Sequence, residues 1–337
     1  MSTTPATETF VTLDGIRAAA ERIKPIARKT PLLDVSGAAG RPFFLKCENL
    51  QPMGAFKIRG AYNMVAQLTP AQLEAGVITY SSGNHGQAVA LAAQKLGAPA
   101  VIVMPTTAPR IKIDGARAFG AEVIFAGTTS VERQARAEQE AAARGLTIVP
   151  PFDHEKVVEG QGTTALEILE QLPSVAAVLV PIGGGGLAAG VSAAIKQSRP
   201  EVLVIGVEPT GAAGMKAAVD AGHPVTLPKT ETIADGLMPV RAGDITYAHV
   251  RKFVDHVITV EDKQIIDAVF WIFTNAHLVA EPSGAATTAA FLSGALDAVA
   301  KVTGPTVAIV SGGNMDASRL TELAGTRAQR PEAGENP

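Results

Sequence analysis

Four consecutive glycines, Gly183 to Gly186, carry the strongest chemical signal in the sequence. An apolar stretch that is typical of a buried strand, Ala176–Val180, precedes them, and a helical pattern begins near Leu187. Glycines let successive backbone N–H groups converge on one anion, and a helix N-terminus adds partial positive charge behind them. The pattern therefore predicts a cradle for a phosphate group.

The kind of phosphate compound stays open at this point. The loop lacks the lysine and the adjoining Ser or Thr of a Walker A motif, which argues against a nucleoside triphosphatase. A loose dinucleotide fingerprint, Gly184-x-Gly186-x-x-Ala189, is followed by Glu208 after the next predicted strand. A nicotinamide-dependent oxidoreductase is therefore one alternative.

A lysine at the start of a predicted helix is the second candidate. The turn Pro52-Met53-Gly54 precedes the helix and places Lys57 in its first turn. The positive end of a helix lowers the pKa of a neighbouring amine, as a Schiff-base lysine requires. A single lysine at such a position is more often simply solvated, so this motif gains weight only beside others.

Two further loops follow predicted strands. In the segment Ser81–Gly86, small residues expose N–H groups at a helix start, which suits a carboxylate, while Asn84 offers an amide and Ser82 a hydroxyl. An ordinary N-cap turn is the alternative. Ser311 directly follows the last predicted strand, where its hydroxyl can face a heteroaromatic nitrogen or simply end the strand.

Short Val- and Ile-rich runs alternate with Ala-rich helical patterns along the chain. The predicted strands are Val77–Tyr80, Ala100–Met104, Glu122–Phe125, Thr147–Val149, Ala176–Val180, Val202–Val207 and Thr306–Val310. The predicted helices are Gly86–Leu96, Arg110–Phe119, Ser130–Ala143, Gly162–Leu172 and Leu187–Gln197. This alternation predicts an α/β fold with parallel sheets covered on both faces, and ligands beyond the carboxyl ends of the strands.

Composition excludes several classes of protein. The 337 residues are 47% hydrophobic and 18% charged, which argues against disorder and suits about two domains or one large α/β unit. A net charge of −3 gives no electrostatic footprint for nucleic acid or for an anionic membrane. Cys47 is the one cysteine, so a disulfide within the chain is impossible and a cysteine-based zinc site is not expected.

The N-terminal residues contain neither a basic start nor an apolar run, so we expect no secretory signal and a cytoplasmic location. The uncharged stretch Leu172–Ile195 is long enough to span a bilayer. Pro181 and the four glycines interrupt it, so we expect a strand, a loop and a helix there instead.

Together and in this order, the four motifs resemble the fold-type II pyridoxal-phosphate enzymes, above all the threonine/serine dehydratases and serine racemases. The resemblance extends from about Arg17 to Asp316. It includes Phe152-Asp153, Gly160-Gln161-Gly162-Thr163, Thr232–Leu237 and Glu281-Pro282-Ser283-Gly284. It favours pyridoxal 5'-phosphate over a dinucleotide in the glycine loop.

The resemblance implies a tryptophan synthase β-like fold, with two open α/β lobes and mostly parallel, twisted sheets. Residues 1–52 and 151–325 would form the large cofactor-binding lobe, and residues 53–150 the small mobile lobe. Residues 326–337 would be a disordered tail. Because the chain ends soon after Ser311-Gly312-Gly313-Asn314, we expect no C-terminal regulatory domain.

The roles of individual residues follow from the same resemblance. Lys57 matches the Schiff-base lysine, Asn84 the residue that bonds the ring hydroxyl oxygen, and Ser311 the residue that faces the pyridine nitrogen. The full set of implied cofactor-binding residues is Phe56, Lys57, Asn84, Gly183, Gly184, Gly185, Gly186, Leu187, Gly236, Glu281 and Ser311. The implied substrate-binding residues are Ser81, Ser82, Gly83, Asn84, His85 and Arg133, and the implied catalytic residues are Lys57 and Ser82.

The implied activity is β-elimination, which converts L-threonine to 2-oxobutanoate and L-serine to pyruvate, each with release of ammonia. Ser82 leaves serine racemase open, since racemisation needs an acid–base group on each face of Cα. Arg133 leaves a 3-hydroxyaspartate ammonia-lyase open, since a guanidinium can bind a second carboxylate, although a solvated helix face is the simpler interpretation. A non-catalytic binder of pyridoxal phosphate or of a nucleotide is the alternative from another class.

The resemblance also bears on metal and assembly. Eukaryotic racemases have a Glu and an Asp around the motif at Glu208-Pro209, and Gly214 here replaces that Asp, so we assign no metal. The implied partners are a small hydroxy amino acid and further copies of the chain, in a homodimer or homotetramer.

Overall fold

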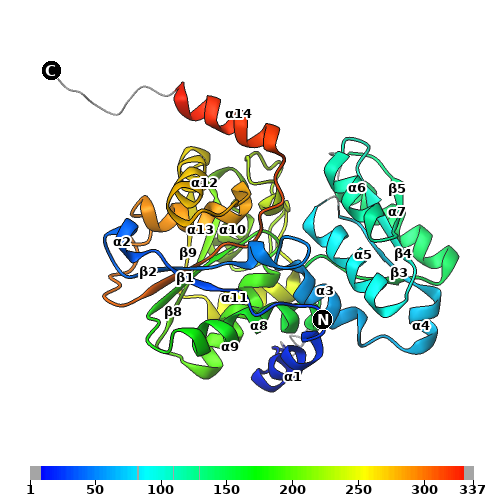
Figure 1. Ribbon diagram of the computed structural model, residues 1–337. Coiled ribbons are helices and arrows are strands. Elements are labelled where there is room, and N and C mark those ends of the chain that lie inside the picture. The colour runs from blue at the N-terminus through cyan, green and yellow to red at the C-terminus, as the bar shows by residue number, and fades with distance from the viewer. Residues whose placement is uncertain (1–8, 82, 109, 129, 330–337) are drawn as a thin grey trace.

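The computed structural model describes residues 9–329, apart from residues 82, 109 and 129. Its elements form two groups (Figure 1). The elements from α3 to β6 lie on one side, the rest form a larger body, and α14 projects from that body.

The larger body is built on a six-stranded sheet with the order β1-β2-β10-β7-β8-β9. Its strands are β1 (Leu32–Asp34), β2 (Phe43–Lys46), β7 (Ala177–Pro181), β8 (Leu203–Pro209), β9 (His256–Val260) and β10 (Thr306–Ile309). Strand β1 pairs antiparallel with β2, and the other pairs are parallel.

The smaller group is built on a four-stranded, fully parallel sheet with the order β5-β4-β3-β6. Its strands are β3 (Val77–Thr79), β4 (Ala100–Met104), β5 (Glu122–Phe125) and β6 (Thr147–Ile148). The expected α/β class with mostly parallel sheets is therefore confirmed.

Helices cover both sheets. The longer ones are α1 (Leu13–Ile23), α3 (Lys57–Val65), α5 (Asn84–Leu96), α6 (Arg110–Ala118), α7 (Ser130–Arg144), α8 (Glu155–Gln171), α9 (Gly186–Ser198), α10 (Gly214–Ala221), α11 (Asp244–Phe253), α12 (Asp262–Ala276), α13 (Pro282–Leu292) and α14 (Ala317–Ala328). The short ones are α2 (Ser36–Ala39), α4 (Pro70–Ala75), and the 3-10 turns η1 (Glu48–Leu50), η2 (Thr210–Ala212) and η3 (Asp235–Leu237).

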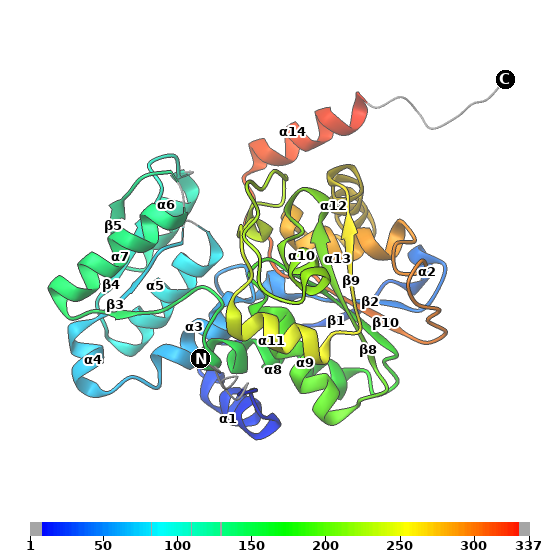
Figure 2. The same ribbon diagram turned by 180° about the vertical axis from the view of Figure 1, so that it is seen from behind.

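Alternate side chains of the large sheet enter two separate cores. Val178 and Val180 of β7 pack with α8, α9 and α11, whereas Leu179 packs with α12 and α13. In Figure 2, α8, α9 and α11 lie together beneath the strands. A strand with both faces buried must be apolar at every position, which is why β7 has no polar alternation.

Three structural observations bear on the remaining expectations. The uncharged stretch 172–195 contains β7, the glycine loop and most of α9, and no described helix is long and apolar enough to cross a membrane. Helix α14 runs to Ala328, two residues beyond the start of the expected tail, because Leu323 is buried and Arg327 pairs with Asp267. Cys47 is buried after β2, where burial raises the pKa of its thiol to about 12.

Candidate active site

The segment that carries Lys57 pairs directly with the segment that follows β10. The N–H of Phe56 donates to the carbonyl oxygen of Ser311 at 3.0 Å, and the N–H of Gly313 donates to that of Gly54 at 2.9 Å. An isolated antiparallel bridge between Ala55 and Gly312 completes the pairing. Two motifs that are about 255 positions apart in the sequence therefore form one short ladder.

Lys57 is the first residue of α3, and its side chain is half-buried. Nζ donates to the carbonyl oxygen of Pro151 at 2.7 Å and lies 5.2 Å from the centre of the Phe56 ring. Burial lowers the pKa of Lys57 to about 8. Sequence reasoning had assigned such a lowering to the helix terminus, whereas the structure shows burial as the cause.

The glycine loop joins β7 to α9, and Phe152 and Thr246 contact it. Gly185 is the N-cap of α9 with φ 98°, a conformation that favours glycine. A Cβ on Gly184 would lie 2.2 Å from the ring of Phe152. The carbonyl oxygen of Gly184 accepts the Thr246 hydroxyl at 2.6 Å.

Asp153 holds the start of α11, the helix whose Thr246 bonds the glycine loop. Its carboxylate accepts the backbone N–H groups of Asp244, Ile245 and Thr246 at 2.9 to 3.1 Å, which caps the start of α11. Within the described residues, none of the hydrogen bonds uses an N–H of Gly183 to Gly186, so these donors remain available to an anion.

Asn84 connects the two groups of elements. It is the first residue of α5, and its Nδ2 donates to Oε1 of Glu281 at 2.6 Å, just before α13. Burial raises the pKa of Glu281 to about 8, and the nearby carboxylate of Asp235 adds to this effect. Lys112 of α6 pairs with Asp235, which gives a second contact between the groups.

Ser311 and Gly236 both form hydrogen bonds with Ser283, a residue to which the sequence analysis assigned no role. Ser311 is buried, and its Oγ donates weakly to the carbonyl oxygen of Ser283 at 3.4 Å. The Oγ of Ser283 accepts the N–H of Gly236 at 2.8 Å. A Cβ on Gly183 would lie 3.0 Å from the carbonyl oxygen of Gly236, so η3 borders the glycine loop.

The expected substrate-binding loop is described in part. The Ser81 hydroxyl accepts the N–H of Gly83 at 3.3 Å, while Ser82 lies outside the described residues. Nε2 of His85 donates to the carbonyl oxygen of Val149 at 3.0 Å. Burial lowers the pKa of His85 to about 3, so this ring stays neutral and offers no cation to a carboxylate.

Arg133 lies in the first turn of α7 and is half-buried. Its Nη1 donates to the carbonyl oxygen of Thr128 at 3.3 Å, and burial lowers the pKa of the guanidinium. Its buried Nε has no hydrogen-bond partner among the described residues. A half-buried cation with an unused donor is costly, and an incoming carboxylate would relieve that cost.

Glu208, near the end of β8, caps the start of α10. Its two oxygens accept the N–H groups of Met215 and Lys216, each at 2.8 Å, in the first turn of α10. Burial raises the pKa of Glu208 to about 7. These bonds account for both carboxylate oxygens.

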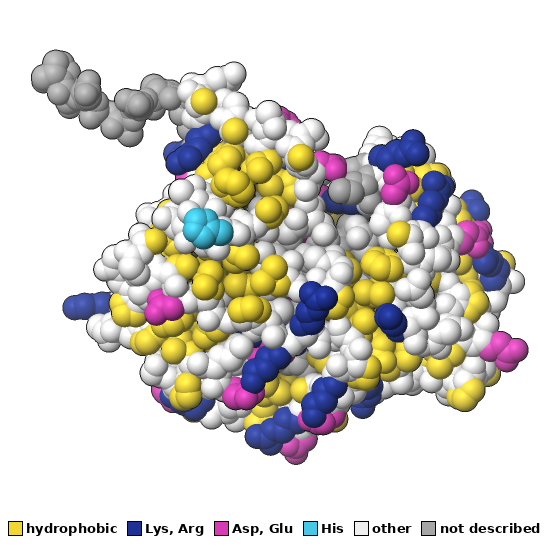
Figure 3. Space-filling model, viewed as in Figure 1, with side chains coloured by type: hydrophobic (Ala, Val, Ile, Leu, Met, Phe, Trp, Pro, Cys, Tyr) yellow, Lys and Arg dark blue, Asp and Glu magenta, His cyan; other side chains and the backbone are white. Residues whose placement is uncertain are grey.

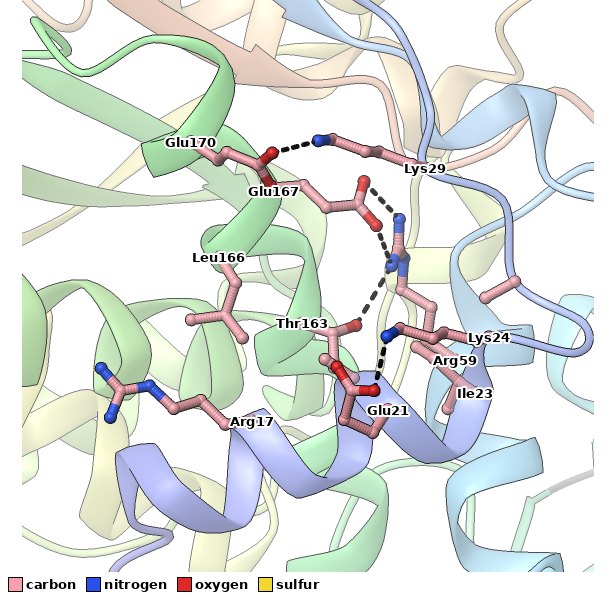
Figure 4. A pocket seen from close by; sticks show the side chains of 12 residues that line it. Arg17, Glu21, Ile23, Lys24, Lys29, Arg59, Thr163, Leu166, Glu167 and Glu170 are labelled. Atoms are coloured by element: carbon pink, nitrogen blue, oxygen red, sulfur yellow. Dashed lines mark hydrogen bonds and ion pairs between the residues drawn. The ribbon is translucent and has the colours of Figure 1, made fainter.

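A buried ion network fixes α3 behind Lys57. The guanidinium of Arg59 bonds both oxygens of Glu48 at 2.7 and 2.8 Å and both oxygens of Glu167 at 2.7 and 2.9 Å. Lys46 also donates to Glu167, at 2.5 Å. Figure 4 shows Arg59 between Glu167 and Thr163, facing a groove between α1 and α8 that Lys57 does not line.

Comparison with known proteins agrees with this geometry. Residues 23–312 match the family described as "Pyridoxal-phosphate dependent enzyme". The chain is 43% identical to an L-threonine ammonia-lyase of Thermotoga maritima over 93% of its length and 78% of that protein. It is 40% identical to a serine racemase of Oryza sativa subsp. indica over 92% of its length and 93% of that protein. A solved structure of maize serine racemase superimposes with a TM-score of 0.89 and 38% identity, covering 95% of this chain and 98% of that one.

Proposed function

The chain belongs to the pyridoxal-phosphate dependent enzymes, and on that basis we propose that it eliminates the β-hydroxyl of L-threonine and L-serine. The products would be 2-oxobutanoate or pyruvate, each with ammonia. The observation that carries the proposal is the amine of Lys57, with a pKa lowered to about 8, together with the unbonded N–H groups of the glycine loop. Lys57 bonds the carbonyl oxygen of Pro151, and the next residue, Phe152, packs on Gly184 of that loop. An amine with that pKa is a nucleophile and a proton acceptor near neutral pH.

The residues present fit the cofactor. The N–H groups of Gly183 to Gly186 at the start of α9 suit its phosphate, and a Cβ at Gly184 would disturb this cradle through Phe152. Lys57 suits its aldehyde, and the Ser311 hydroxyl suits its ring nitrogen. When bound, the cofactor withdraws electrons from the substrate Cα and makes its proton acidic.

Each of three residues of this chain would then have a separate role in the reaction. The Lys57 amine takes the Cα proton, which its lowered pKa permits. Ser311 is neutral and leaves the ring nitrogen without a charged partner, which favours loss of the β-hydroxyl over transamination. The bond from Asn84 to Glu281 holds the start of α5 against the start of α13.

The test is release of 2-keto acid from L-threonine and L-serine by the purified, cofactor-loaded protein. Lys57→Ala should abolish release and also remove the visible absorption band of the covalently held cofactor. Lys95→Ala, on the exposed face of α5, is the matched control and should retain both. A Lys57→Ala protein that still releases keto acid at the wild-type rate would refute the assignment.

Two other reactions have support from particular residues. The unbonded Nε of Arg133 favours a substrate with a second carboxylate, such as 3-hydroxyaspartate. Arg133→Ala should then lose hydroxyaspartate turnover and retain threonine turnover, whereas Arg136→Ala, on the same helix and paired with Glu140, should change neither. Equal loss of both substrates would contradict this role.

Serine racemase activity is the second, supported by the similarity to racemases and by the presence of Ser82, the residue that the family resemblance implies as a second acid–base group. Incubation with L-serine should then yield D-serine, and Ser82→Ala should abolish that product while pyruvate release continues. Absence of D-serine at full pyruvate turnover would exclude it.

We also propose that the chain forms a homo-oligomer. Large hydrophobic side chains such as Leu50, Phe273 and Val279 are exposed, and Figure 3 shows hydrophobic side chains gathered on the large body below α14. Exposed groups of this kind are typical of protein interfaces. Light scattering during size exclusion should give two or four chains, and a mass of one chain would refute the proposal.

A further inference from the structure

Asn314 follows β10 and contacts both halves of the site. Its Nδ2 donates to the carbonyl oxygen of Met53 at 2.9 Å and to Oδ1 of Asn84 at 2.8 Å. A side-chain amide has two N–H donors, so these bonds use both. A Cβ on Gly54, which has φ 79°, would lie 2.2 Å from Oδ1 of Asn314, so the side chain also packs on this turn.

The backbone carbonyl of Met53 determines which way the Asn314 amide points. A carbonyl oxygen only accepts, so Nδ2 of Asn314 must face it. The same nitrogen then faces Asn84, so the Asn84 atom that meets it must be the oxygen. A reversed Asn314 amide would place its oxygen against two other oxygens, Met53 O and Asn84 Oδ1.

The orientation of Asn84 follows from this arrangement. With its oxygen committed to Asn314, its NH₂ group faces Glu281, to which it donates at 2.6 Å. One N–H is used there, and the second is left over. This second donor is the one that the ring hydroxyl oxygen of the cofactor would accept under the proposed function.

We propose that Asn314 is a positioning residue, which holds the Asn84 amide with its N–H donors toward Glu281 and the cofactor. The role rests on the proposed function, since it gives Asn84 a cofactor contact. The Asn314 side chain also connects the Met53–Gly54 turn, which precedes Lys57, to the start of α5. It therefore fixes the lysine and the Asn84 donor relative to each other. Without Asn314, the bond to Glu281 is the one remaining side-chain bond of Asn84 among the described residues that opposes reversal of its amide.

Asn314→Leu keeps a similar volume and removes both donors, and Asn84→Ala removes the proposed ring contact. We expect each variant to bind pyridoxal phosphate roughly tenfold more weakly, the worth of about one hydrogen bond. We also expect each to shift the pH midpoint of the cofactor absorption band. The double variant should resemble Asn84→Ala alone, because Asn314 acts through Asn84.

Asn63→Leu is the control for a purely structural loss. Asn63 is a buried amide that donates to the carbonyl oxygen of Lys156, and this variant should lower the unfolding temperature without moving the band midpoint. Should Asn314→Leu fail to fold, Asn314→Asp tests the same point, because it keeps the size and loses both donors.

Unchanged affinity and midpoint in Asn314→Leu, beside an altered Asn84→Ala, would overturn the positioning role alone. Additive effects in the double variant would overturn it as well. If Asn84→Ala itself changed neither quantity, the proposed cofactor contact of Asn84 would fall, and the role of Asn314 with it. These outcomes are distinguishable because affinity, midpoint and unfolding temperature are measured on the same proteins.

Discussion

Replacing Arg59 with methionine tests how the chain holds α3 and the lysine at its start. The network contains two cations, Arg59 and Lys46, and two anions, Glu48 and Glu167. Arg59 and Glu48 are buried, so neither charge is compensated by water. The variant leaves one cation against two anions in the same buried space.

The expected cost follows from that charge count. Removing one partner of a buried pair costs about 3–5 kcal/mol, because the remaining charge is left without compensation. Removing both members of the pair leaves Lys46 with Glu167, which is balanced. Arg59→Met combined with Glu48→Gln should therefore be more stable than Arg59→Met alone.

The pH dependence of the free energy of unfolding provides an independent test of this explanation. Burial raises the pKa of Glu48 and the ion pair with Arg59 lowers it, and the net effect in the native protein is a lowered pKa. Without Arg59, burial dominates and the pKa rises above its unfolded value. The Glu48 contribution to stability is then present at low pH and is lost as the pH rises through the folded pKa, the reverse of the native protein.

Urea unfolding of the cofactor-free protein, followed by circular dichroism at pH 5 and pH 7.5, measures both effects. Arg144→Met is the control, since Arg144 pairs with Glu122 at an exposed site and should cost less than about 1 kcal/mol. The reasoning is refuted if Arg59→Met costs no more than this control. It is refuted as well if the added Glu48→Gln change restores nothing.

Two further predictions concern the site itself. Gly184→Ala should bind pyridoxal phosphate more weakly and lose about 1–3 kcal/mol in urea unfolding, because its Cβ would lie 2.2 Å from the Phe152 ring; Gly37→Ala, whose Cβ meets nothing within 4 Å, should change neither. Burial raises the pKa of Glu281 from 4.5 to about 8, so its contribution to the stability of the cofactor-free protein is full below pH 4.5 and is lost as the pH rises through 8. That loss is about 5 kcal/mol, and Glu281→Gln should remove this pH dependence. If the free energy of unfolding differed between pH 5 and pH 8 by the same amount in the variant as in the wild type, this prediction would be contradicted.

Sequence patterns located β3, β4, β7 and β10, which are buried at every position, and also the partly exposed edge strand β5, whereas the largely buried β2 was not predicted. The bounds of β4 and β5 are those predicted, and β3, β7 and β10 differ by one residue at one or both ends. Continuous apolar runs of this kind are informative because every position must be buried. Strand β9, an edge strand with one exposed and two half-exposed positions, gave no such run and was not predicted.

Helix α8 shows why helix bounds were harder to predict. The pattern predicted a start at Gly162, whereas the helix begins at Glu155 and includes two glycines. Glycine normally weakens a helix interior, so the sequence argued against the first two turns. A Cβ on Gly160 would lie 2.6 Å from the carbonyl oxygen of Arg59, so the glycine is needed where α3 passes close to α8.

The candidate site was predictable only where its residues stand in a local motif. Lys57, the glycine loop and Ser311 each follow a recognisable turn or strand. Ser283 and Asn314 were not assigned, because their bonds join segments 47 and 230 positions away. A single sequence gives no sign of such long-range pairs.

The burial of Cys47 makes the protein a convenient subject for distance measurements. A thiol with a pKa of about 12 stays protonated and hidden at neutral pH, so maleimide reagents should leave the native chain unlabelled. Cysteines introduced at an exposed position on α7 and at another on α11 would then be the only reactive pair. Spin or dye labels on that pair would report directly whether the distance between the two sheets changes when substrate is added.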